Sequence, residues 1–342
     1  MKYAEILGIE YYLPQYIETN KEIAEKFPDW TIEKIEAKTG IVERHIAAPT
    51  ETASDLAYQA AEKLFTSGLC SRQDIDYLIL CTESPDYILP STACILQDRL
   101  KLKKSVGAFD FNLGCSGYIY GLSIAKGLIE SGQASGILLL TADTYSKYIH
   151  PEDRSVRTIF GDGAAATYIR ASNLAYPAIS IPQLGTDGSG FKNLIIEQGG
   201  LRSPKINSHS EDRSQFLHMN GPEIFNFTLQ AVPSLIDQTL KASGKRLEDI
   251  DYFIFHQANH YMLEHLRIKI GIPKEKFCID IRHYGNTVSS TIPIALSNTI
   301  NNHLVKPGDN ILLVGFGVGY SWGSIFVSVS EALIRKRRSE CE

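Results

Sequence analysis

A chain of 342 residues is too long for one ordinary hydrophobic core, so the sequence predicts two domains or one large duplicated unit. Hydrophobic residues make up 44% of the chain and charged residues 21%, the balance of a globular protein, and no apolar run is long enough to cross a bilayer. A net charge of −5 argues against a nucleic-acid partner, because neutralising phosphates requires a basic face. We therefore expect a cytoplasmic protein without membrane insertion. The basic run at 335–338 is predicted to be a solvated tail.

The first half alternates apolar runs with segments of helical spacing, which is typical of an α/β fold. Strands are predicted at 4–12, 77–81, 106–111, 137–141 and 164–169, and helices at 52–67 and 92–102. The six cysteines are scattered without a CxxC pair, so neither a disulfide framework nor a metal site is indicated.

The second half repeats this plan. Residues 74–81 (DIDYLILC) recur 175 positions on as 249–256 (DIDYFIFH), and Ile137-Leu-Leu-Leu recurs 174 positions on as Ile311-Leu-Leu-Val. Two matches at nearly one offset indicate a duplicated unit, divided here into residues 1–171 and 172–342. The segment 184–221, rich in Gly, Ser and Asn, lacks a counterpart in the first half. It is either an insertion that covers or shapes a site, or a plain surface loop.

Cys115 is a candidate nucleophile. It follows the predicted strand 106–111 through Gly114 and precedes a helix of small and apolar residues. The unpaired amides and macrodipole at a helix N-terminus favour the thiolate over the thiol. The alternative is that this cysteine is only a small buried hydrophobe.

Two further polar residues stand just past predicted strands of the second half. His256 ends the repeated run. Asn286 closes the stretch Asp280-Ile-Arg-His-Tyr-Gly-Asn286, which is predicted to end a strand, and an apolar helix is predicted from Pro293. If the halves pack pseudo-symmetrically, equivalent strand ends converge, and Cys115, His256 and Asn286 become neighbours. Taken singly, the histidine could be a satisfied core residue and the asparagine a turn residue.

These three side chains suit chemistry on thioesters. A thiolate attacks a thioester readily, so an acyl group can be held on Cys115. A neutral imidazole and an amide donating to one oxygen suit an enolate, which fits loss of CO2 from a malonyl thioester. A hydrolase would instead need a histidine placed to activate water.

Two glycine runs, 161–166 and 315–319, are similar to phosphate-binding loops by letter. The dinucleotide fingerprint requires a helix after the glycines. Here strands are predicted instead, at 164–169 for the first run and at 324–330 for the second. Their glycines are expected to permit tight turns and close backbone approach, and to supply an oxyanion amide.

Together with several further motifs, these residues resemble the ketoacyl-acyl-carrier-protein synthase III family of the thiolase superfamily. The matching motifs occur in family order: Thr39-Gly-Ile-Val-Glu-Arg-His45, Gly114-Cys-Ser-Gly117, Phe160-Gly-Asp-Gly163, Met219-Asn-Gly-Pro-Glu-Ile-Phe225, His256-Gln-Ala-Asn259, Gly285-Asn-Thr287 and Gly315-Phe-Gly-Val-Gly-Tyr-Ser-Trp-Gly323.

The resemblance implies a five-layered αβαβα thiolase fold in a homodimer. Cys115 would accept a primer acyl group from coenzyme A, and His256 and Asn286 would be the decarboxylation pair, with Phe316 beside them. The acceptor would be malonyl on an acyl carrier protein, and no metal or redox cofactor would be needed.

The resemblance also assigns residues to coenzyme A and to the acyl pocket. Trp30 and Arg154 match positions that sandwich the adenine, a stacking and cation–π role. Lys38 keeps the charge of a nearby basic residue but loses planar stacking. Phe225 and Asn259 fall in the motifs that bind coenzyme A, and Gly317 and Val318 belong to the oxyanion backbone, with Val318 where a glycine is common.

Two departures from the family bear on specificity. After Asn259 the family has a leucine and an arginine tied to carrier docking, where this chain has His260 and Tyr261, although Arg267 and Lys269 follow on the same predicted helix. Leu89 stands where a larger phenylalanine often lines the primer pocket, which predicts a primer longer or more branched than acetyl.

The sequence therefore predicts a condensing acyltransferase that joins an acyl-coenzyme A primer to a malonyl thioester. The rival hypothesis keeps the acyl-cysteine but passes the acyl group to an amine or hydroxyl without decarboxylation. A third, that the chain is a non-catalytic partner subunit, is disfavoured because Cys115, His256 and Asn286 are all intact.

Overall fold

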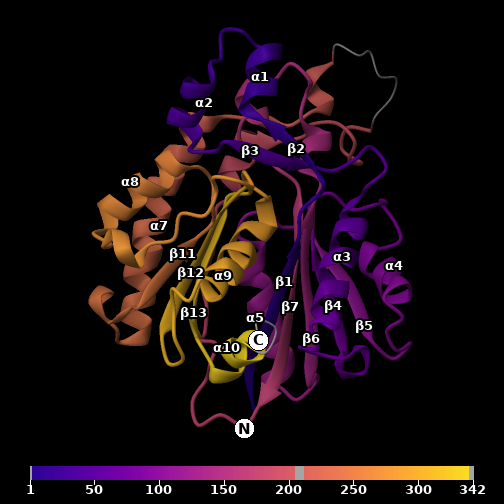
Figure 1. The fold of residues 1–342 in the computed structure, drawn as a ribbon, viewed down its shortest axis with the longest axis vertical. Helices are drawn as coiled ribbons and strands as arrows, with labels where there is room; N and C mark the ends of the chain where they lie inside the picture. The colour runs from indigo at the N-terminus through magenta and orange to yellow at the C-terminus, as the bar shows by residue number, and fades with distance from the viewer. Residues whose placement is uncertain (1, 205–211, 339–342) are drawn as a thin grey trace.

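Two mixed β-sheets, built in the same order in the two halves of the chain, carry the fold (Figure 1). The computed structural model describes residues 2–204 and 212–338. The first half contains β1 (Tyr3–Tyr12), β2 (Tyr16–Thr19), α1 (Asn20–Lys26), α2 (Ile32–Thr39), β3 (Glu43–Ile46), α3 (Ala53–Thr66), β4 (Tyr77–Cys81), α4 (Thr92–Arg99), β5 (Gly107–Phe111), α5 (Gly117–Glu130), β6 (Gly136–Asp143), α6 (Arg154–Arg157) and β7 (Gly163–Ser172). The second contains β8 (Gln183–Thr186), β9 (Leu194–Ile195), β10 (His218–Met219), α7 (Gly221–Ser243), β11 (Tyr252–Phe255), α8 (His260–Ile270), α9 (Thr291–Asn301), β12 (Asn310–Gly317), β13 (Ser321–Ser328) and α10 (Glu331–Arg338).

The strand order confirms the predicted duplication. The first sheet runs β1-β7-β6-β4-β5 and the second β8-β13-β12-β11. In each sheet the strand carrying the repeated motif lies parallel to its neighbour, β4 to β6 and β11 to β12, and that neighbour pairs antiparallel with the next strand. The strands predicted in the first half correspond to β1, β4, β5, β6 and β7.

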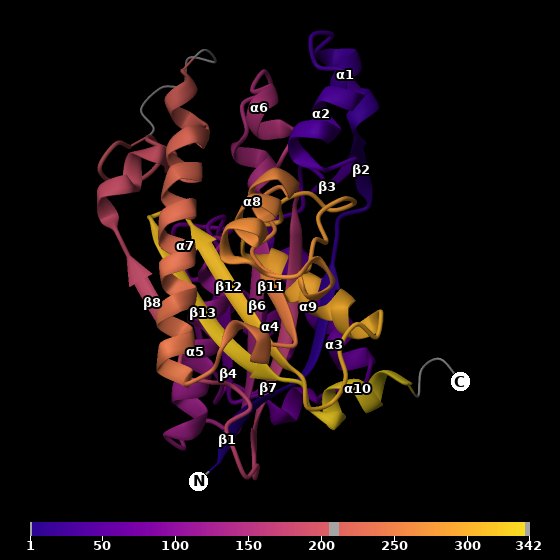
Figure 2. The same ribbon diagram turned by 90° about the vertical axis from the view of Figure 1, so that its left-hand side faces the viewer.

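Helices and sheets stack in five layers (Figures 1 and 2). The side chains of single strands pack on the layers to either side. On β6, Ile137 and Leu139 pack with the central helices α5 and α9, whereas Leu138 and Leu140 pack with the outer helix α3. The strand β12 alternates in the same way between the central helices and the outer helices α7 and α8. Because successive side chains of a strand point to opposite faces, each sheet is buried on both sides. The thiolase-like αβαβα layering is therefore confirmed.

The strand predicted before Asn286 is wrong. Within the described residues, this stretch makes only two isolated bridges, Phe277 with Phe253 of β11 and Asn286 with Phe160. The reason is that the side chain of Gln257 takes the place of a strand neighbour, because its Oε1 accepts the Asp280 N–H at 2.8 Å. The apolar helix that follows begins at Thr291, two residues earlier than predicted.

The segment 184–221, which the structure describes at 184–204 and 212–221, shapes the site rather than forming a plain surface loop. Its first residues belong to β8, which pairs with β13 as β1 pairs with β7, so this part does have a counterpart in the first half. Farther on, β9 pairs with β10 and brings Leu194 and Met219 to the cavity described below.

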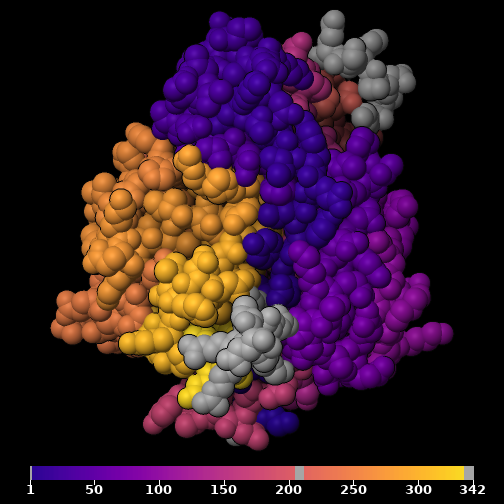
Figure 3. Space-filling view, viewed as in Figure 1, coloured from indigo at the N-terminus to yellow at the C-terminus, as the bar shows by residue number. Residues whose placement is uncertain are grey.

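Elements near both ends of the chain lie outside the two main sheets. Strands β2 and β3 and helices α1 and α2 form a cap, indigo in Figure 3, and α2 contacts α8. The backbone of the basic run 335–338 is the last part of α10. Among the described helices, none is long and apolar enough to cross a membrane.

Candidate active site

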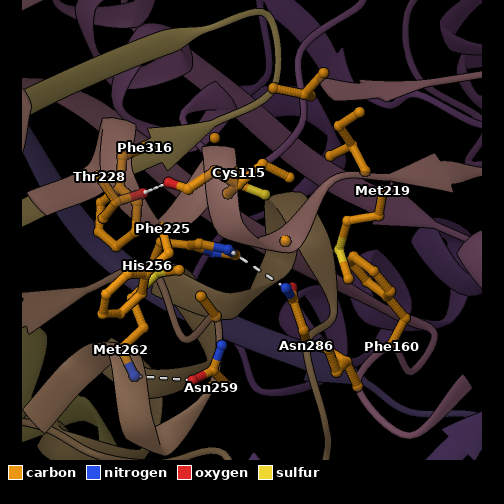
Figure 4. Close-up of a pocket in the computed structure, with 17 residues that line it drawn as sticks. Cys115, Phe160, Met219, Phe225, Thr228, His256, Asn259, Met262, Asn286 and Phe316 are labelled. Atoms are coloured by element: carbon orange, nitrogen blue, oxygen red, sulfur yellow. Dashed lines mark hydrogen bonds between the residues drawn. The ribbon is translucent and has the colours of Figure 1, made fainter. Parts of the chain in front are cut away.

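One cavity of about 160 Å³ collects Cys115, His256 and Asn286 (Figure 4). Its remaining wall is mostly apolar and includes side chains from both halves of the chain. The convergence predicted from equivalent strand ends therefore occurs.

Cys115 lies in the turn between β5 and α5, against the backbone of β12. A Cβ on Gly317 would stand 2.7 Å from the Cβ of Cys115 and 3.0 Å from its sulfur, and one on Gly315 would stand 2.8 Å from Cα of Ser116. No other residue type fits at these two positions without displacing the nucleophile. The expected close approach of the glycine run is confirmed.

The resting state of Cys115 differs from the expected thiolate. Burial first, and then the nearby carboxyls of Glu83 and Asp143, raise the pKa of the thiol well above its usual range. The backbone N–H of Cys115 acts in the opposite direction and is outweighed. A helix N-terminus therefore does not by itself ionise this sulfur, because desolvation penalises the charged form more strongly.

His256 stands just past β11 and is 2% exposed. Its Nδ1 lies 2.7 Å from Oγ1 of Thr291 at the start of α9, and the ring of Phe316 meets its ring edge-to-face at 5.5 Å. Desolvation lowers the pKa of His256 to about 3. The imidazole is therefore neutral throughout the range in which the protein would work.

Asn286 is fixed by backbone pairing across the two halves. Its N–H donates to the Ile159 carbonyl at 2.8 Å, and its own carbonyl accepts from the Gly161 N–H at 3.1 Å. The side-chain Oδ1 accepts the N–H of Val288 at 2.9 Å, which turns Nδ2 toward His256 Nε2, 3.5 Å away. Two nitrogens thus face one region of the cavity beside the thiol.

Comparison with known proteins identifies the family. Residues 109–188 match the model of 3-oxoacyl-[acyl-carrier-protein] synthase III, and residues 240–329 match the model of its C-terminal part. The beta-ketoacyl-[acyl-carrier-protein] synthase III of Clostridium perfringens is 39% identical over 96% of this chain and 100% of its own length. This chain belongs to the 3-oxoacyl-acyl-carrier-protein synthase III family. It is an acyl-transferring condensing enzyme.

Solved structures agree with this assignment. A 3-oxoacyl-(acyl-carrier-protein) synthase III at 50% identity superposes with a TM-score of 0.93, covering 96% of this chain and 100% of the other. The 3-oxoacyl-(acyl-carrier protein) synthase of Burkholderia xenovorans superposes with a TM-score of 0.89 at 37% identity, covering 98% of this chain and 97% of the other.

The residues expected to hold coenzyme A in this family member fall into two groups. Phe225 and Asn259 line the cavity, where Asn259 Oδ1 also caps α8 by accepting the Met262 N–H at 2.8 Å. Trp30, Lys38 and Arg154 lie outside the cavity lining. The Lys38 ammonium stands 5.0 Å from the centre of the Trp30 ring, and Arg154 forms an ion pair at 3.5 Å with Asp29, the neighbour of Trp30.

The expected pocket residues divide in a similar way. Phe316, Gly317 and Val318 line the cavity. Leu89 does not line the cavity of its own chain, because it lies in an exposed apolar segment, 87–89, where it is 79% accessible.

The two basic side chains of α8 are already engaged. Arg267 forms an ion pair with Glu264 at 2.7 Å, and the Lys269 ammonium donates to the Leu229 carbonyl at 2.8 Å. This helix of the synthase therefore offers less unpaired positive charge than its sequence indicates.

Three residues near the reacting atoms were not singled out from the sequence. The carboxyls of Glu83 and Asp143 lie close enough to Cys115 to raise the pKa of its thiol. Thr291 contacts the imidazole of His256. Glu83 and Asp143 both stand at the carboxyl ends of first-sheet strands, so the rule that found His256 could have found them too. Within 2–204 and 212–338, no cluster of three His, Cys, Asp or Glu side chains could hold a metal ion.

Proposed function

We propose that this synthase condenses an acyl-coenzyme A primer with malonyl-acyl carrier protein, giving 3-oxoacyl-acyl carrier protein, CO2 and coenzyme A. The observation that carries the proposal is the pair of side-chain nitrogens, His256 Nε2 and Asn286 Nδ2, that lie 3.5 Å apart in the cavity of the Cys115 thiol. The names of the relatives support the product, a 3-oxoacyl-acyl carrier protein.

In the first half-reaction, the thiol of Cys115 loses its proton and its sulfur attacks the thioester carbon of the primer. The bond from that carbon to the coenzyme A sulfur breaks, and coenzyme A leaves as a thiol after taking up one proton. Cys115 then holds the primer as a thioester. The mostly apolar cavity wall keeps water away from this intermediate.

In the second half-reaction, the thioester oxygen of the malonyl group accepts hydrogen bonds from His256 Nε2–H and Asn286 Nδ2–H. The bond to the carboxylate breaks, CO2 leaves, and the electron pair forms an enolate on that oxygen. The enolate carbon attacks the acyl carbonyl on Cys115, the bond to the Cys115 sulfur breaks, and the released thiolate takes up one proton from solvent to restore the thiol. The neutral imidazole of His256, with its proton on Nε2, can act as a preorganised donor to the developing oxyanion.

The coenzyme A site would extend from the cavity to the cap. We propose that Phe225 and Asn259 contact the pantetheine arm, that Trp30 and Arg154 hold the adenine between them, and that Lys38 adds charge beside Trp30. The cation–π contact of Lys38 with Trp30 and the ion pair of Arg154 with Asp29 support this grouping. The backbone amides of Gly317 and Val318 would stabilise the tetrahedral oxyanion on Cys115.

We further propose a cytoplasmic homodimer in which residues 87–89 pack against the second copy. Their side chains are 62, 88 and 79% accessible in the single chain, which is unusual for a run of Tyr, Ile and Leu. Leu89 would then line the primer pocket of the partner, where its small size leaves room for a longer or branched primer. Five free cysteines among the described residues fit a reducing compartment.

The deciding experiment supplies a panel of acyl-coenzyme A primers with carboxyl-labelled malonyl-acyl carrier protein and follows labelled CO2. Primer-dependent release with a 3-oxoacyl product supports the proposal and names the primer. Acylation of Cys115 without CO2 release would instead favour transfer to an amine or hydroxyl. A Cys115→Ala variant that still gained the acyl mass would remove Cys115 from the mechanism.

A further inference from the structure

Glu83 brings a carboxyl group to the turn that carries the nucleophile. It stands two residues past the end of β4, at the sheet edge where Cys115 also lies. A Cβ on Gly114 would stand 2.4 Å from Oε2 of Glu83 and 3.2 Å from Oε1. The absence of a side chain at Gly114 therefore gives this carboxyl direct access to the backbone next to Cys115.

The groups that face Glu83 among the described residues carry no positive charge. The hydroxyl of Tyr145 donates to Oε2 at 2.9 Å, and the Tyr148 hydroxyl donates to the backbone carbonyl of Glu83 at 3.2 Å. The N–H of Glu83 donates to Asp143 Oδ1 at 2.8 Å, and Cys81 ends the strand that leads to it. Glu83 is therefore not a partner in an ion pair, which is the usual structural reason for an enclosed carboxylate.

Acylation needs a place for the thiol proton, and His256 does not offer one. Its Nδ1 is engaged with Thr291, and its neutral ring sits in a desolvated position that disfavours an imidazolium. Asp143 is also committed, because Oδ1 accepts the Glu83 N–H and Oδ2 accepts both the hydroxyl and the N–H of Ser289. In contrast, the hydrogen bond from Tyr145 engages only Oε2 of Glu83.

The electrostatics agree with this geometry. Burial and the charge of Asp143 raise the pKa of Glu83 to about 8, and the Tyr145 hydroxyl acts in the opposite direction. Glu83 is in turn the first charge, after burial, that raises the pKa of the Cys115 thiol. The carboxyl and the thiol are thus coupled. When the pair has lost one proton, the remaining proton can reside on either group.

We propose that Glu83 accepts the thiol proton of Cys115 when the primer is loaded. The Cys115 sulfur forms its bond to the acyl carbon as its proton moves to the Glu83 carboxylate. The bond from that carbon to the coenzyme A sulfur then breaks, and the departing thiolate takes the proton back from Glu83. This inference rests on the acyl-transfer half of the proposed function.

The test measures the rate of acyl-Cys115 formation by intact-protein mass spectrometry after rapid quenching, between pH 6 and 10. In the wild-type protein the rate should rise through a step near pH 8. Glu83→Gln should be slower by about a hundredfold, as expected for loss of a proton acceptor, and should lack the step. Tyr145→Phe should move the step to higher pH, because it removes the hydrogen bond that stabilises the carboxylate. Glu25→Gln, which changes an exposed carboxylate on α1, is the matched control and should resemble the wild type.

Alkylation of Cys115 by iodoacetamide over the same pH range separates this proposal from the proposed function. If Glu83 accepts the proton, Glu83→Gln slows alkylation, and Glu83→Asp restores part of the rate. Faster alkylation in Glu83→Gln would show that the carboxylate only opposes the thiolate, and an unchanged pH profile would show that it does neither; both outcomes overturn the proposal. Wild-type protein that alkylates normally but takes no acyl group from any coenzyme A thioester would refute the proposed function alone.

Discussion

At the scale of single residues, Thr291 determines which nitrogen of His256 can donate to a substrate. Its hydroxyl has one proton and two neighbours, His256 Nδ1 at 2.7 Å and the Val288 carbonyl at 3.1 Å. When the hydroxyl donates to Nδ1, the ring proton resides on Nε2, the nitrogen that faces Asn286. The shorter contact favours this tautomer, which is the one that the decarboxylation step needs.

Thr291→Val should therefore slow CO2 release about tenfold, the order of effect of one lost hydrogen bond, while leaving acylation of Cys115 unchanged. The two half-reactions are measured separately, by acyl-enzyme mass and by labelled CO2. Thr291→Ser keeps the hydroxyl and should retain most of the activity. A valine variant that released CO2 at the wild-type rate would show that the hydroxyl does not set the tautomer.

Asn286→Ala removes the second donor. Because acylation does not use this amide, the variant should still form acyl-Cys115 but condense about a hundredfold more slowly, the usual loss for one oxyanion donor. Asn226→Ala, on the exposed face of α7, controls for the substitution itself. Equal loss of both half-reactions would mean that Asn286 acts through its contact with Val288 and is structural.

At the scale of elements, β12 serves both halves of the site with alternate residues. Phe316 packs against His256, while Gly315 and Gly317 face the turn that carries Cys115. The period of two along a strand makes this division possible. A single strand therefore sets both how closely the Cys115 turn can approach β12 and where the His256 ring lies.

Gly317→Ala tests this role of β12. The new Cβ would lie 2.7 Å from the Cβ of Cys115, so the turn or the strand must shift, at a cost of about 1–3 kcal/mol. We expect a lower urea midpoint of unfolding and slower acylation. Gly188→Ala is the matched control, because a Cβ there would meet nothing within 4 Å. Wild-type values for Gly317→Ala in both measurements would show that the close approach is not required.

At the scale of the whole molecule, the sequence was informative wherever one repeat could be compared with the other. The duplicated run placed His256 at a strand end equivalent to that of Cys81, and the structure confirms its convergence with Cys115 and Asn286. The charge state of Cys115 was not predictable, because the burial that raises its pKa most is a tertiary property that the sequence does not display. The strand expected before Asn286 failed for a similar reason, since a side chain, Gln257, replaces the neighbouring backbone.

Buried polar groups meet at the joint between the two halves, beside its apolar core, and they make the stability of the molecule depend on pH. Asp143 of the first half accepts from Ser289 of the second, and Thr141 and Ser290 hydroxyls meet across the joint at 2.9 Å. Burial raises the pKa of Asp162 to about 6, of Asp143 to about 7 and of Glu83 to about 8. These values all exceed those of unfolded carboxyls, which lie near 4.

A carboxyl whose pKa is higher in the folded state binds more protons when folded, so its contribution to stability is complete below about pH 4 and is lost as the pH rises through the folded value. The urea midpoint should therefore fall between pH 6 and pH 9, as these three groups ionise in turn. His256 titrates in the opposite sense, but its contribution changes only below its unfolded pKa of about 6.5. Asp143→Asn should flatten the fall, whereas Glu25→Gln should leave it unchanged. A midpoint that stayed constant or rose from pH 6 to pH 9 would show that these carboxyls are ionised in the folded protein at neutral pH.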